Sequence, residues 1–460
     1  MINSILGYSS LDSIVAYHHI QPKSLRDILA DLIFLDQQLP KQPYILNLYE
    51  DRYYFLLGLL LGIKRNSIQL FPSSITAHTL NYLQKNYPQI LVLNHSSVSI
   101  DKSEFYDIEV LLGQQSPQTQ SQHYQLCDLE IFFSKACLDS EQVVIFTSGS
   151  TGNPKPYKKS WQDFIAVGKA LKQQFDLSPE TQVLATVPAQ HMYGLEVSIM
   201  MPLVNGLNIL SQRPFYPADI ESILIRSQKS CILVSTPIHI RACQKSQLKL
   251  PFLQLCISAT APLEHQLAKD FEQFQNIPLF EIYGCTEVGV IATRQTAHSQ
   301  RWHCLADIEL TSEAKNAEDI YLRTNRSINT FLLNDYISEI NHNSFLLLGR
   351  KQDIINIAGK RTSLAYLNHH LLNIQSVEDG CFFQLDIKDD IHQRLVAFIV
   401  TNDKNKDFKK QIIARLEEKI EPVFLPRQYY FVKQIPRNTT GKIGYNDMRG
   451  LYQTSRAKQQ

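Results

Sequence analysis

The stretch Thr147-Ser148-Gly149-Ser150-Thr151-Gly152-Asn153-Pro154-Lys155-Pro156 follows the apolar run 143–146 and precedes Ser160-Trp161-Gln162-Asp163. The apolar run is typical of a buried strand, and Ser160 with an acid three residues later indicates a helix start. Glycines let backbone N–H groups converge on an anion, while the hydroxyls and Lys155 add donors and positive charge. The stretch therefore predicts a phosphate-binding loop between a strand and a helix.

Two well-known nucleotide-binding patterns do not match this loop. A Walker A loop needs four residues between its first glycine and Gly-Lys-Ser/Thr, whereas Gly149 and Gly152 are separated by two residues. No Gly-x-Gly-x-x-Gly fingerprint lies nearby either. A plain Ser/Gly surface loop remains the alternative when this segment is taken alone.

Four further segments follow in the chain: Pro188-Ala189-Gln190-His191-Met192-Tyr193-Gly194, Tyr283-Gly284-Cys285-Thr286-Glu287, Asp335 with Gly349-Arg350, and Pro436-Arg437-Asn438-Thr439-Thr440-Gly441-Lys442. Together with the first loop, this ordered set resembles the motifs of the adenylate-forming enzymes. That family comprises acyl- and aryl-CoA synthetases, peptide-synthetase adenylation domains and luciferases. The resemblance implies an enzyme that activates a carboxylic acid with ATP.

Length and composition indicate an ordinary globular protein of two or three domains. The 460 residues are 44% apolar and 19% charged, and 45 basic against 44 acidic residues argue against a nucleic-acid partner. The eight cysteines show no zinc-ligand spacing. No signal peptide is apparent, and the longest near-apolar run, Tyr53 to Ile63, is too short to span a bilayer. We therefore expect a cytoplasmic protein with no integral membrane segment.

Strand-like and helix-like runs alternate over the first three-quarters of the chain, which predicts parallel sheets covered by helices. The predicted strands are 44–49, 68–71, 90–93, 143–146, 183–187, 207–210, 232–235, 253–257 and 279–282, and the predicted helices are 51–63, 76–85 and 263–274. Around residue 349 the pattern changes to that of a small α+β module, with strands at 345–348, 354–357, 381–385, 395–400 and 429–432 and helices at 363–372 and 408–418. The predicted fold is α/β, with an adenylation core at 1–349 and a small, mobile C-terminal domain at 350–460 that carries Lys442.

The resemblance implies a nucleotide site at the carboxyl ends of the strands, where α/β sheets bind ligands. It assigns nucleotide binding to Thr147, Ser148, Gly149, Ser150, Thr151, Gly152, Lys155, Ser258, Ala259, Thr260, Tyr283, Gly284, Asp335 and Arg350. In this site Tyr283 would cover the adenine face, and Asp335 would accept hydrogen bonds from the ribose hydroxyls. Glu287 would hold Mg²⁺, which prefers carboxylate and phosphate oxygens.

The same resemblance implies catalytic roles for Thr286, His191 and above all Lys442. Thr286 would donate to the α-phosphate, and the Lys442 ammonium would neutralise charge between the substrate carboxylate and that phosphate. His191, Tyr193 and Gly194 would form the acid pocket. Each residue has a plain structural alternative: a solvated lysine, a packed histidine, a core tyrosine, a helix-start glutamate or a turn aspartate.

The segment 190–194 carries no aspartate to hold an amino acid's α-ammonium, and Glu196 lies beyond the glycine. This favours an apolar or aromatic acid, passed to CoA or to a phosphopantetheinylated carrier protein. The chain also resembles synthetases of aryl-polyene and pigment gene clusters, which implies an aryl acid and an acyl carrier protein. A stand-alone amino-acid adenylating domain and a non-catalytic acyl-binding member remain the alternatives.

The chain departs from the usual family motifs at four places. Pro156 follows Lys155 where relatives usually carry glycine, and Asn334 precedes Asp335 where glycine is usual. Gln352 occupies the expected hinge position, and 358–362 is an unusual version of the segment that faces the thiol. These departures bear on the rotation of the small domain and on the identity of the acceptor.

Overall fold

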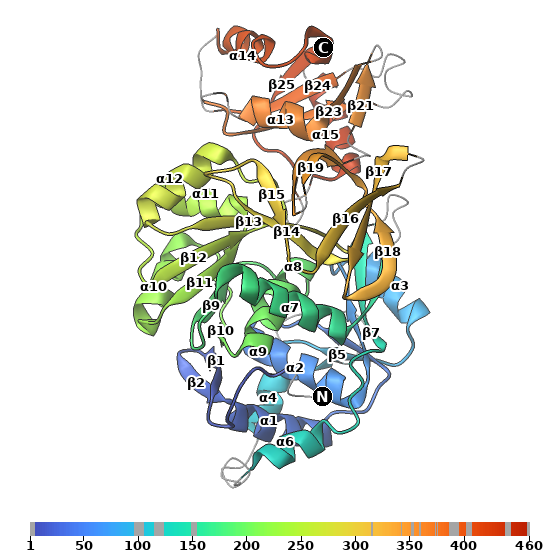
Figure 1. Ribbon diagram of the computed structural model, residues 1–460, viewed down its shortest axis with the longest axis vertical. Coiled ribbons are helices and arrows are strands. Elements are labelled where there is room, and N and C mark those ends of the chain that lie inside the picture. The colour runs from blue at the N-terminus through green and yellow to red at the C-terminus, as the bar shows by residue number, and fades with distance from the viewer. Residues whose placement is uncertain are drawn as a thin grey trace.

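The structure, a computed structural model, describes residues 5–95, 105–114, 124–148, 154–313, 316–341, 343–350, 354–357, 360–372, 374, 376–385, 395–401, 407–437 and 443–457. Most of the described chain forms a large lobe, and the residues after 350 form a small module at one end of it (Figure 1). Among the described residues, no helix has both the length and the apolar character needed to cross a membrane.

The large lobe is built on an 11-stranded mixed sheet. In spatial order its strands are β19 (Asp335–Asn341), β20 (Ser344–Arg350), β15 (Arg301–Cys304), β14 (Gly289–Gln295), β13 (Leu279–Cys285), β12 (Leu253–Ser258), β11 (Cys231–Ser235), β9 (Gln182–Ala185), β10 (Asn208–Leu210), β1 (Ile14–His18) and β2 (Gln21–Ser24). The strands from β13 to β1 run parallel, and the outer pairs on both sides are antiparallel. The predicted parallel strands are thus confirmed as the centre of this sheet.

A second, six-stranded sheet lies on the other side of a helical layer. Its order is β6 (Phe105–Tyr106), β5 (Ile90–Leu93), β3 (Tyr44–Asn47), β4 (Ile68–Phe71), β7 (Glu141–Ser148) and β8 (Pro154–Ser160). Every neighbouring pair is parallel except β7 and β8. In both sheets the parallel strands therefore end in loops at their carboxyl ends, which is where α/β sheets bind ligands.

Helix α2 (Arg52–Arg65) explains the longest apolar run of the sequence. It contacts β1 and β10 of the large sheet as well as β3 and β4 of the second sheet, so it is buried between them. A helix that is apolar all round is expected in such a place. Helix α7 (Trp161–Phe175) is similarly placed, since it contacts β7, β8 and β14.

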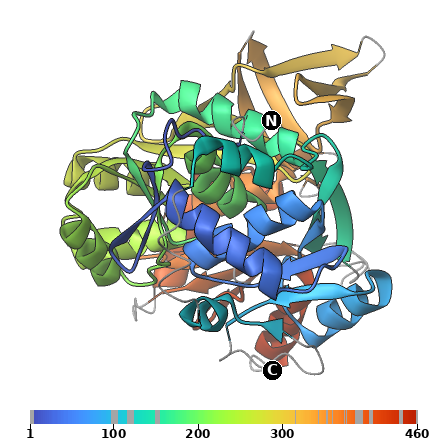
Figure 2. The same cartoon turned by 90° about the horizontal axis from the view of Figure 1, so that it is seen from below.

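The other helices of the large lobe cover its sheets and outer surface. They are α1 (Leu25–Gln38), α3 (Ala77–Asn86), α4 (Ile108–Gly113), α6 (Leu126–Phe132), α8 (Met192–Gly194), the π-helix η2 (Leu195–Met200), α9 (Met201–Asn205), α10 (Pro217–Ser227), α11 (Pro237–Ser246) and α12 (His265–Gln275). Helices α10 to α12 lie together on one face of the large sheet (Figure 1). A three-stranded sheet, β16 (Ile308–Glu313), β17 (Asn316–Thr324) and β18 (Ser327–Leu332), projects from the lobe (Figure 2).

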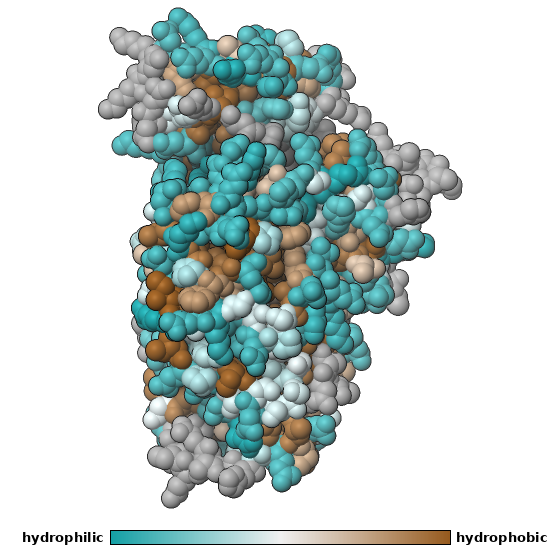
Figure 3. All heavy atoms as spheres, turned by 60° about the vertical axis from the view of Figure 1, so that its left-hand side comes forward, coloured by the Kyte–Doolittle hydropathy of each residue, from teal (hydrophilic) through white to brown (hydrophobic). Residues whose placement is uncertain are grey.

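The C-terminal module has hydrophobic cores of its own. Its elements are β21 (Ile354–Ile357), β22 (Lys360–Ser363), α13 (Leu364–Leu372), β23 (Asp379–Gln384), β24 (Leu395–Val400), α14 (Phe408–Glu417), η4 (Pro422–Phe424), β25 (Gln428–Phe431) and α15 (Tyr445–Ala457). Buried clusters of the large lobe end at Phe345, whereas those of the module begin at Ile355. On the face in Figure 3, polar side chains predominate and apolar ones form small scattered groups.

Sequence reasoning missed several elements at the edges of the fold. The β1–β2 hairpin, α1, the three-stranded sheet and α15 were not predicted. The Gln/Ser-rich stretch 113–122 has a composition typical of an exposed loop, and from residue 115 onward it lies outside the described chain. The central strands were predictable because they are continuous apolar runs buried on both faces.

Candidate active site

The predicted phosphate loop is part of a β-hairpin. Strand β7 ends with Thr147 and Ser148, which pair with Lys155 and Pro154 of β8, and residues 149–153 lie outside the described chain. The expected order of strand, loop and helix is therefore corrected: a second, antiparallel strand comes before the helix. Because β8 pairs along its length with β7, Lys155 projects from a strand rather than from a free loop.

The helix start after the hairpin is confirmed. Ser160 is the N-cap of α7, its hydroxyl accepts from the Asp163 N–H at 3.2 Å, and the Ser160 N–H donates to the Asp163 carboxylate at 2.8 Å. This reciprocal capping box satisfies backbone donors that the first helical turn leaves open. It fixes the junction between the hairpin and a helix that lies on the large sheet.

Lys155 is exposed, and its ammonium lies 4.9 Å from the centre of the Tyr157 ring. Its contact with Tyr157 raises the pKa of the lysine, so the side chain is cationic at neutral pH. The side chain of Ser148, and Gly149, Ser150, Thr151 and Gly152, lie outside what the structure describes. Of the predicted phosphate-binding side chains, those of Thr147 and Lys155 are the ones that the structure places.

Tyr283 and Asp335 lie together. The Tyr283 hydroxyl donates to the Asp335 carboxylate at 2.5 Å, although the two residues are 52 positions apart in the chain. The ring of Tyr283 packs against Trp302 and Phe345, with ring centres 5.6 and 5.8 Å away. In the β19–β20 ladder Asp335 pairs with Arg350, so the backbones of these two predicted ribose-binding residues are neighbours.

Thr286 and Glu287 follow Tyr283 in a turn that joins β13 to β14, and both are partly exposed. A small cavity beside this turn is lined by Cys285, Glu287, Val288, Leu322, Phe331, Leu332, Leu333, Asn334 and Asp335. At Gly284, a Cβ atom would lie 2.4 Å from the carbonyl oxygen of Gly289, so the close approach of the two strands requires glycine there. The cavity brings the predicted metal ligand and the predicted ribose ligand to one place.

Two buried cationic side chains donate hydrogen bonds to backbone carbonyl oxygens in and after this turn. The Lys159 ammonium donates to the Glu287 carbonyl oxygen at 2.8 Å, and the Arg326 guanidinium donates to the Val290 carbonyl oxygen at 2.7 Å. Arg326 is held in turn by Asp307 at 2.5 and 2.7 Å. The backbone is thus held within the predicted metal-binding turn, at Glu287, and just after it, at Val290.

Glu196, on η2 directly after the predicted acid pocket, completes this buried group. Its side chain lies against Gly289, where φ is +93° and a Cβ atom would come within 2.2 Å of a carboxylate oxygen. Burial raises the pKa of Glu196 to about 7, while the charges of Lys159 and Arg326 and the Val290 N–H favour the ionised form. Burial likewise lowers the pKa of Lys159, and the carboxylate of Glu196 opposes that shift.

The turn after β12 is the predicted adenine-lining segment Ser258-Ala259-Thr260. Ser258 and Ala259 are buried, and Thr260 adopts a left-handed backbone conformation with φ of +80°. The Ser258 hydroxyl has no hydrogen-bond partner among the described residues. A buried hydroxyl without a partner is costly, so this atom is suited to a hydrogen bond with a bound group.

The predicted acid pocket lies at the ends of neighbouring strands. His191 is the N-cap residue of α8, and Tyr193 is half-buried. The Tyr193 hydroxyl donates toward the carbonyl oxygens of Ile257 at 2.9 Å and Ser235 at 3.2 Å, and burial raises its pKa well above the usual range. A Cβ atom at Gly194 would lie 1.9 Å from the Pro188 carbonyl oxygen, so only glycine fits there.

Arg52, which sequence reasoning missed, holds the segment before this pocket. Its fully buried guanidinium donates to the carbonyl oxygens of Val187 and Gln212 and to the Ser198 hydroxyl, and burial lowers its pKa to about 9. Lys159, Glu196 and Arg326 were also missed as a group. For Glu196 the available signal was a charged residue inside the otherwise apolar run 195–204. The other three residues lie in polar surroundings in the sequence, and pairing between distant segments is not visible in a single sequence.

Lys442, the predicted catalytic lysine, lies outside the described residues, as does the side chain of Arg350. The segment that leads to Lys442 is anchored, because Arg437 pairs with Asp379 of β23 at 2.7 Å. After the gap, helix α15 begins at Tyr445. The role of Lys442 therefore stays a prediction.

Two family models match the chain, "AMP-binding enzyme" over residues 84–309 and "AMP-binding enzyme C-terminal domain" over residues 371–442. With the fold and the clustered motif residues, they show that the chain belongs to the adenylate-forming, AMP-binding enzymes. The predicted class, an AMP-forming acid–thiol ligase, is thereby confirmed.

The sequence identity between the chain and individual relatives is low. The chain is 26% identical to a 4-coumarate–CoA ligase of Halorhodospira halophila over 325 residues, which are 69% of this chain and 78% of the relative. It is similar in fold to the o-succinylbenzoate CoA synthetase of Bacillus subtilis with its acyl-adenylate intermediate, at a TM-score of 0.80, 14% identity and 95% coverage of each chain. The same synthetase with ATP and a magnesium ion gives a TM-score of 0.78 at 14% identity, over 95% of this chain and 97% of that one.

Proposed function

We propose that this chain activates an aryl or acyl carboxylic acid with ATP and passes the acyl group to the phosphopantetheine thiol of CoA or of an acyl carrier protein. A carboxylate oxygen attacks the α-phosphorus of ATP, forming the acyl-adenylate while the bond to pyrophosphate breaks. The thiolate then attacks the acyl carbonyl carbon, forming the thioester and releasing AMP. The observation that carries this proposal is the Tyr283–Asp335 hydrogen bond beside the Glu287 turn in a chain of the adenylate-forming family.

The nucleotide site fits its ligand chemically. Asp335 offers a carboxylate for the ribose, the buried Ser258 hydroxyl lacks a partner among the described residues, and Lys155 offers a cation toward the phosphates. We propose the same role for the residues of the predicted loop that lie beyond the described chain. Positive charge and donors fixed before the reaction lower the cost of bringing a carboxylate to a triphosphate.

Glu287 fits a hard divalent cation. Glu287 lines a cavity together with Asp335, and its backbone carbonyl accepts a hydrogen bond from Lys159. When bound, Mg²⁺ would neutralise charge on the phosphate oxygens. Thr286, next to Glu287, would donate to the α-phosphate.

The acid site favours a substrate without a charged amine. Segment 190–194 contains no carboxylate, and the nearest one, Glu196, is buried against Gly289 and faces Lys159 and Arg326. Glu196 is therefore engaged elsewhere and unsuited to hold a substrate ammonium. The half-buried ring of Tyr193 and the adjoining Met192 suit an apolar or aromatic acid, with His191 beside them.

The C-terminal module is proposed to deliver Lys442 to the carboxylate and the α-phosphate. Separate hydrophobic cores on the two sides of residue 350 support the proposed division into 1–349 and 350–460. A module with its own core can change orientation as a unit without disrupting the packing of the large lobe. Gln352 would lie at the hinge.

The test is acid-dependent exchange of labelled pyrophosphate into ATP, measured with benzoate-like, cinnamate-like, aliphatic and amino acids. We expect exchange with aryl or aliphatic acids and none with amino acids. Thioester formation is then measured with free CoA and with a phosphopantetheinylated carrier protein, since resemblance to pigment-cluster synthetases favours the carrier. Exchange with an amino acid but not with its deaminated analogue would identify an amino-acid adenylating domain instead, and ATP binding without turnover would identify an acyl-binding protein.

A further inference from the structure

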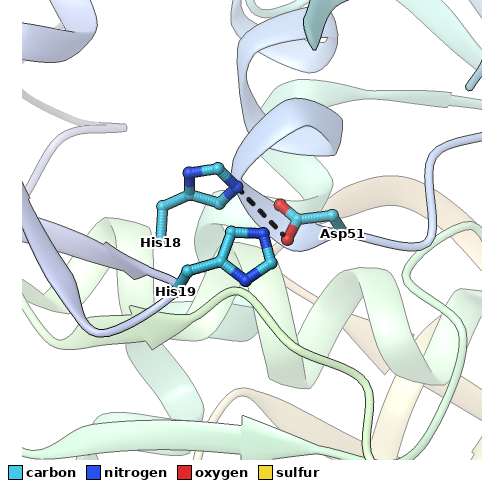
Figure 4. Close-up of side chains that lie close together, drawn as sticks. All are labelled: His18, His19 and Asp51. Carbon is cyan, nitrogen blue, oxygen red and sulfur yellow. Dashed lines mark ion pairs between the residues drawn. The ribbon is translucent and has the colours of Figure 1, made fainter.

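Three metal-ligating side chains converge at the β1–β2 edge of the large sheet. His18 ends β1, His19 follows it in the β1–β2 turn, and Asp51 is the N-cap residue of α2 (Figure 4). One ligand atom from each lies within 4.8 Å of the other two. Both imidazole rings point toward the Asp51 carboxylate in Figure 4. This is the one such group of His, Cys, Asp and Glu found across the described chain.

Two aromatic neighbours fix the position of the His18 ring. The ring stacks on Tyr53 with centres 5.2 Å apart and meets the edge of Tyr54 at 4.9 Å. Its Nε2 atom is buried, has no hydrogen-bond partner among the described residues, and lies 3.7 Å from the Asp51 carboxylate. A buried nitrogen in this state is costly unless a bound group satisfies it. Two ligand atoms on one tetrahedral zinc ion lie about 3.4 Å apart, close to the observed separation.

Asp51 is also fixed in position. One of its oxygens, Oδ1, accepts the N–H groups of Tyr53 at 2.8 Å and Tyr54 at 3.3 Å as the cap of α2. The other oxygen, Oδ2, faces His18. Hydrogen bonds to the non-ligating atom of a metal ligand commonly fix its orientation. The carboxylate can therefore accept a cation without giving up its role in the helix.

The turn that presents His19 is strained. His19 and Ile20 both have left-handed backbone conformations, with φ of +46° and +73°. A two-residue hairpin turn of this kind is normally made of Asn and Gly, and a β-branched residue there is a clear outlier. Strain of this type persists where the surroundings or a function compensate for it. Here it places two adjacent histidines on one side of the turn.

The charges around His18 suit a bound cation. The charges that face it are Asp51, Glu109, His19 and Lys23, and the Lys23 ammonium lies 5.2 Å from the centre of the Tyr53 ring. The two carboxylates offset that one permanent cation.

We propose that His18, His19 and Asp51 form a binding site for a transition-metal dication of the zinc type. Two imidazoles and one carboxylate suit Zn²⁺ and its neighbours, whereas Mg²⁺ prefers oxygen ligands and belongs to the Glu287 turn. Three protein ligands leave the fourth position to water. The bound ion would connect the β1–β2 hairpin to the start of α2. It would stabilise the edge of the sheet, far in strand order from the β13–β14 turn that carries Glu287.

The test is calorimetric titration of the full chain with Zn²⁺ in excess Mg²⁺, supported by the visible absorption of bound Co²⁺. We expect about one ion per chain, and an affinity that falls about tenfold or more in His18→Ala, His19→Ala and Asp51→Asn. Asp51→Asn retains the helix cap, so a loss there is not a loss of fold. Zn²⁺ should also raise the Tm of the wild type and not that of the variants.

The matched control is His303→Ala, which removes an exposed histidine of β15 in another part of the lobe. It should bind Zn²⁺ like the wild type. Absence of stoichiometric binding, or an equal loss of affinity in His303→Ala, would overturn the proposal. Because the readout is metal binding, this result is independent of whether the enzyme activates any acid.

Discussion

Glu196 lies next to the predicted acid pocket in the sequence, but its side chain is buried in another part of the site. Its carboxylate lies with Lys159 and Arg326 behind the Glu287 turn. Three segments meet here: the hairpin supplies Lys159, the segment after the acid pocket supplies Glu196, and the metal-binding turn supplies the Glu287 carbonyl oxygen. The geometry of one part therefore depends on the others.

Glu196→Gln should weaken the use of Mg²⁺ and ATP more than it slows turnover. Above about pH 7, where the Glu196 carboxyl is ionised, the neutral amide leaves Lys159 without its opposite charge, and that lysine holds the Glu287 carbonyl. We expect the KM for Mg-ATP in the exchange assay to rise by about three- to thirtyfold, with kcat changed less. Glu309→Gln, which alters an exposed glutamate of β16, is the control. Equal effects of the two substitutions would remove Glu196 from this role.

Glu196 also gives stability a defined pH dependence. Its pKa is raised from 4.5 to about 7, so between these values the folded chain holds a proton that the unfolded chain has lost. The stabilising contribution is complete below about pH 4.5 and is lost as the pH rises through 7. Urea unfolding should show the free energy of the wild type, relative to Glu196→Gln, falling on the order of 1–3 kcal/mol from pH 5 to 8. A flat difference would show that the carboxyl titrates normally.

Lys442 is the residue whose loss should affect chemistry alone. If its ammonium stabilises charge in the transition state, Lys442→Ala should lower acid-dependent exchange about a hundred- to thousandfold. ATP binding measured by calorimetry should stay within a few-fold of the wild type. Lys433→Ala, an exposed lysine in the same module, should leave exchange unchanged. Full exchange in Lys442→Ala with every active acid would refute the role.

At the scale of elements, Gly194 shows how closely helix α8 approaches the preceding segment. An added methyl group would lie 1.9 Å from the Pro188 carbonyl oxygen, so Gly194→Ala must displace the acid pocket. A displacement near 1 Å at a site of this kind costs about a hundredfold in rate. We expect a loss of that order in acid-dependent exchange, measured across the acid panel.

Gly450→Ala is the control for this substitution. Gly450 lies in α15, and a methyl group added there would have no described atom within 4 Å. Alanine should therefore be tolerated and should stabilise the helix by about 0.5–1 kcal/mol. Thermal unfolding checks the control, and exchange should be unchanged. Wild-type exchange in Gly194→Ala would mean that the segment 188–194 does not shape the acid site.

The sequence made some elements predictable and concealed others for physical reasons. Runs such as 232–235 and 253–257 are buried on both faces of a parallel sheet, so their apolar character identifies them. Strand β8 was missed because Pro154 and Pro156 and its lysines oppose strand propensity, and pairing with β7 prevails. Of the site, the clustering of Tyr283 with Asp335 follows from the motifs, whereas buried charges such as Arg52 depend on distant partners.

At the scale of the molecule, the two sides of residue 350 have separate cores, which makes their independence testable. A chain that ends at residue 353 keeps β19 and β20 complete. We expect it to fold cooperatively by circular dichroism and to bind ATP within a few-fold of the full chain. Its exchange activity should fall as far as that of Lys442→Ala, because both lack the same cation. An unfolded product, or retained exchange, would contradict the proposed division of roles.

The β1–β2 hairpin has a consequence for how these molecules behave at high concentration. Strand β2 is the last strand of the large sheet, and an open strand edge is a template for intermolecular aggregation. It has only four residues, and two of them are Pro22, which lacks an N–H donor, and Lys23, which is charged. Strand β2 is therefore a poor pairing partner for a strand of a second molecule. This property of the sheet edge opposes fibrillar association of the chain.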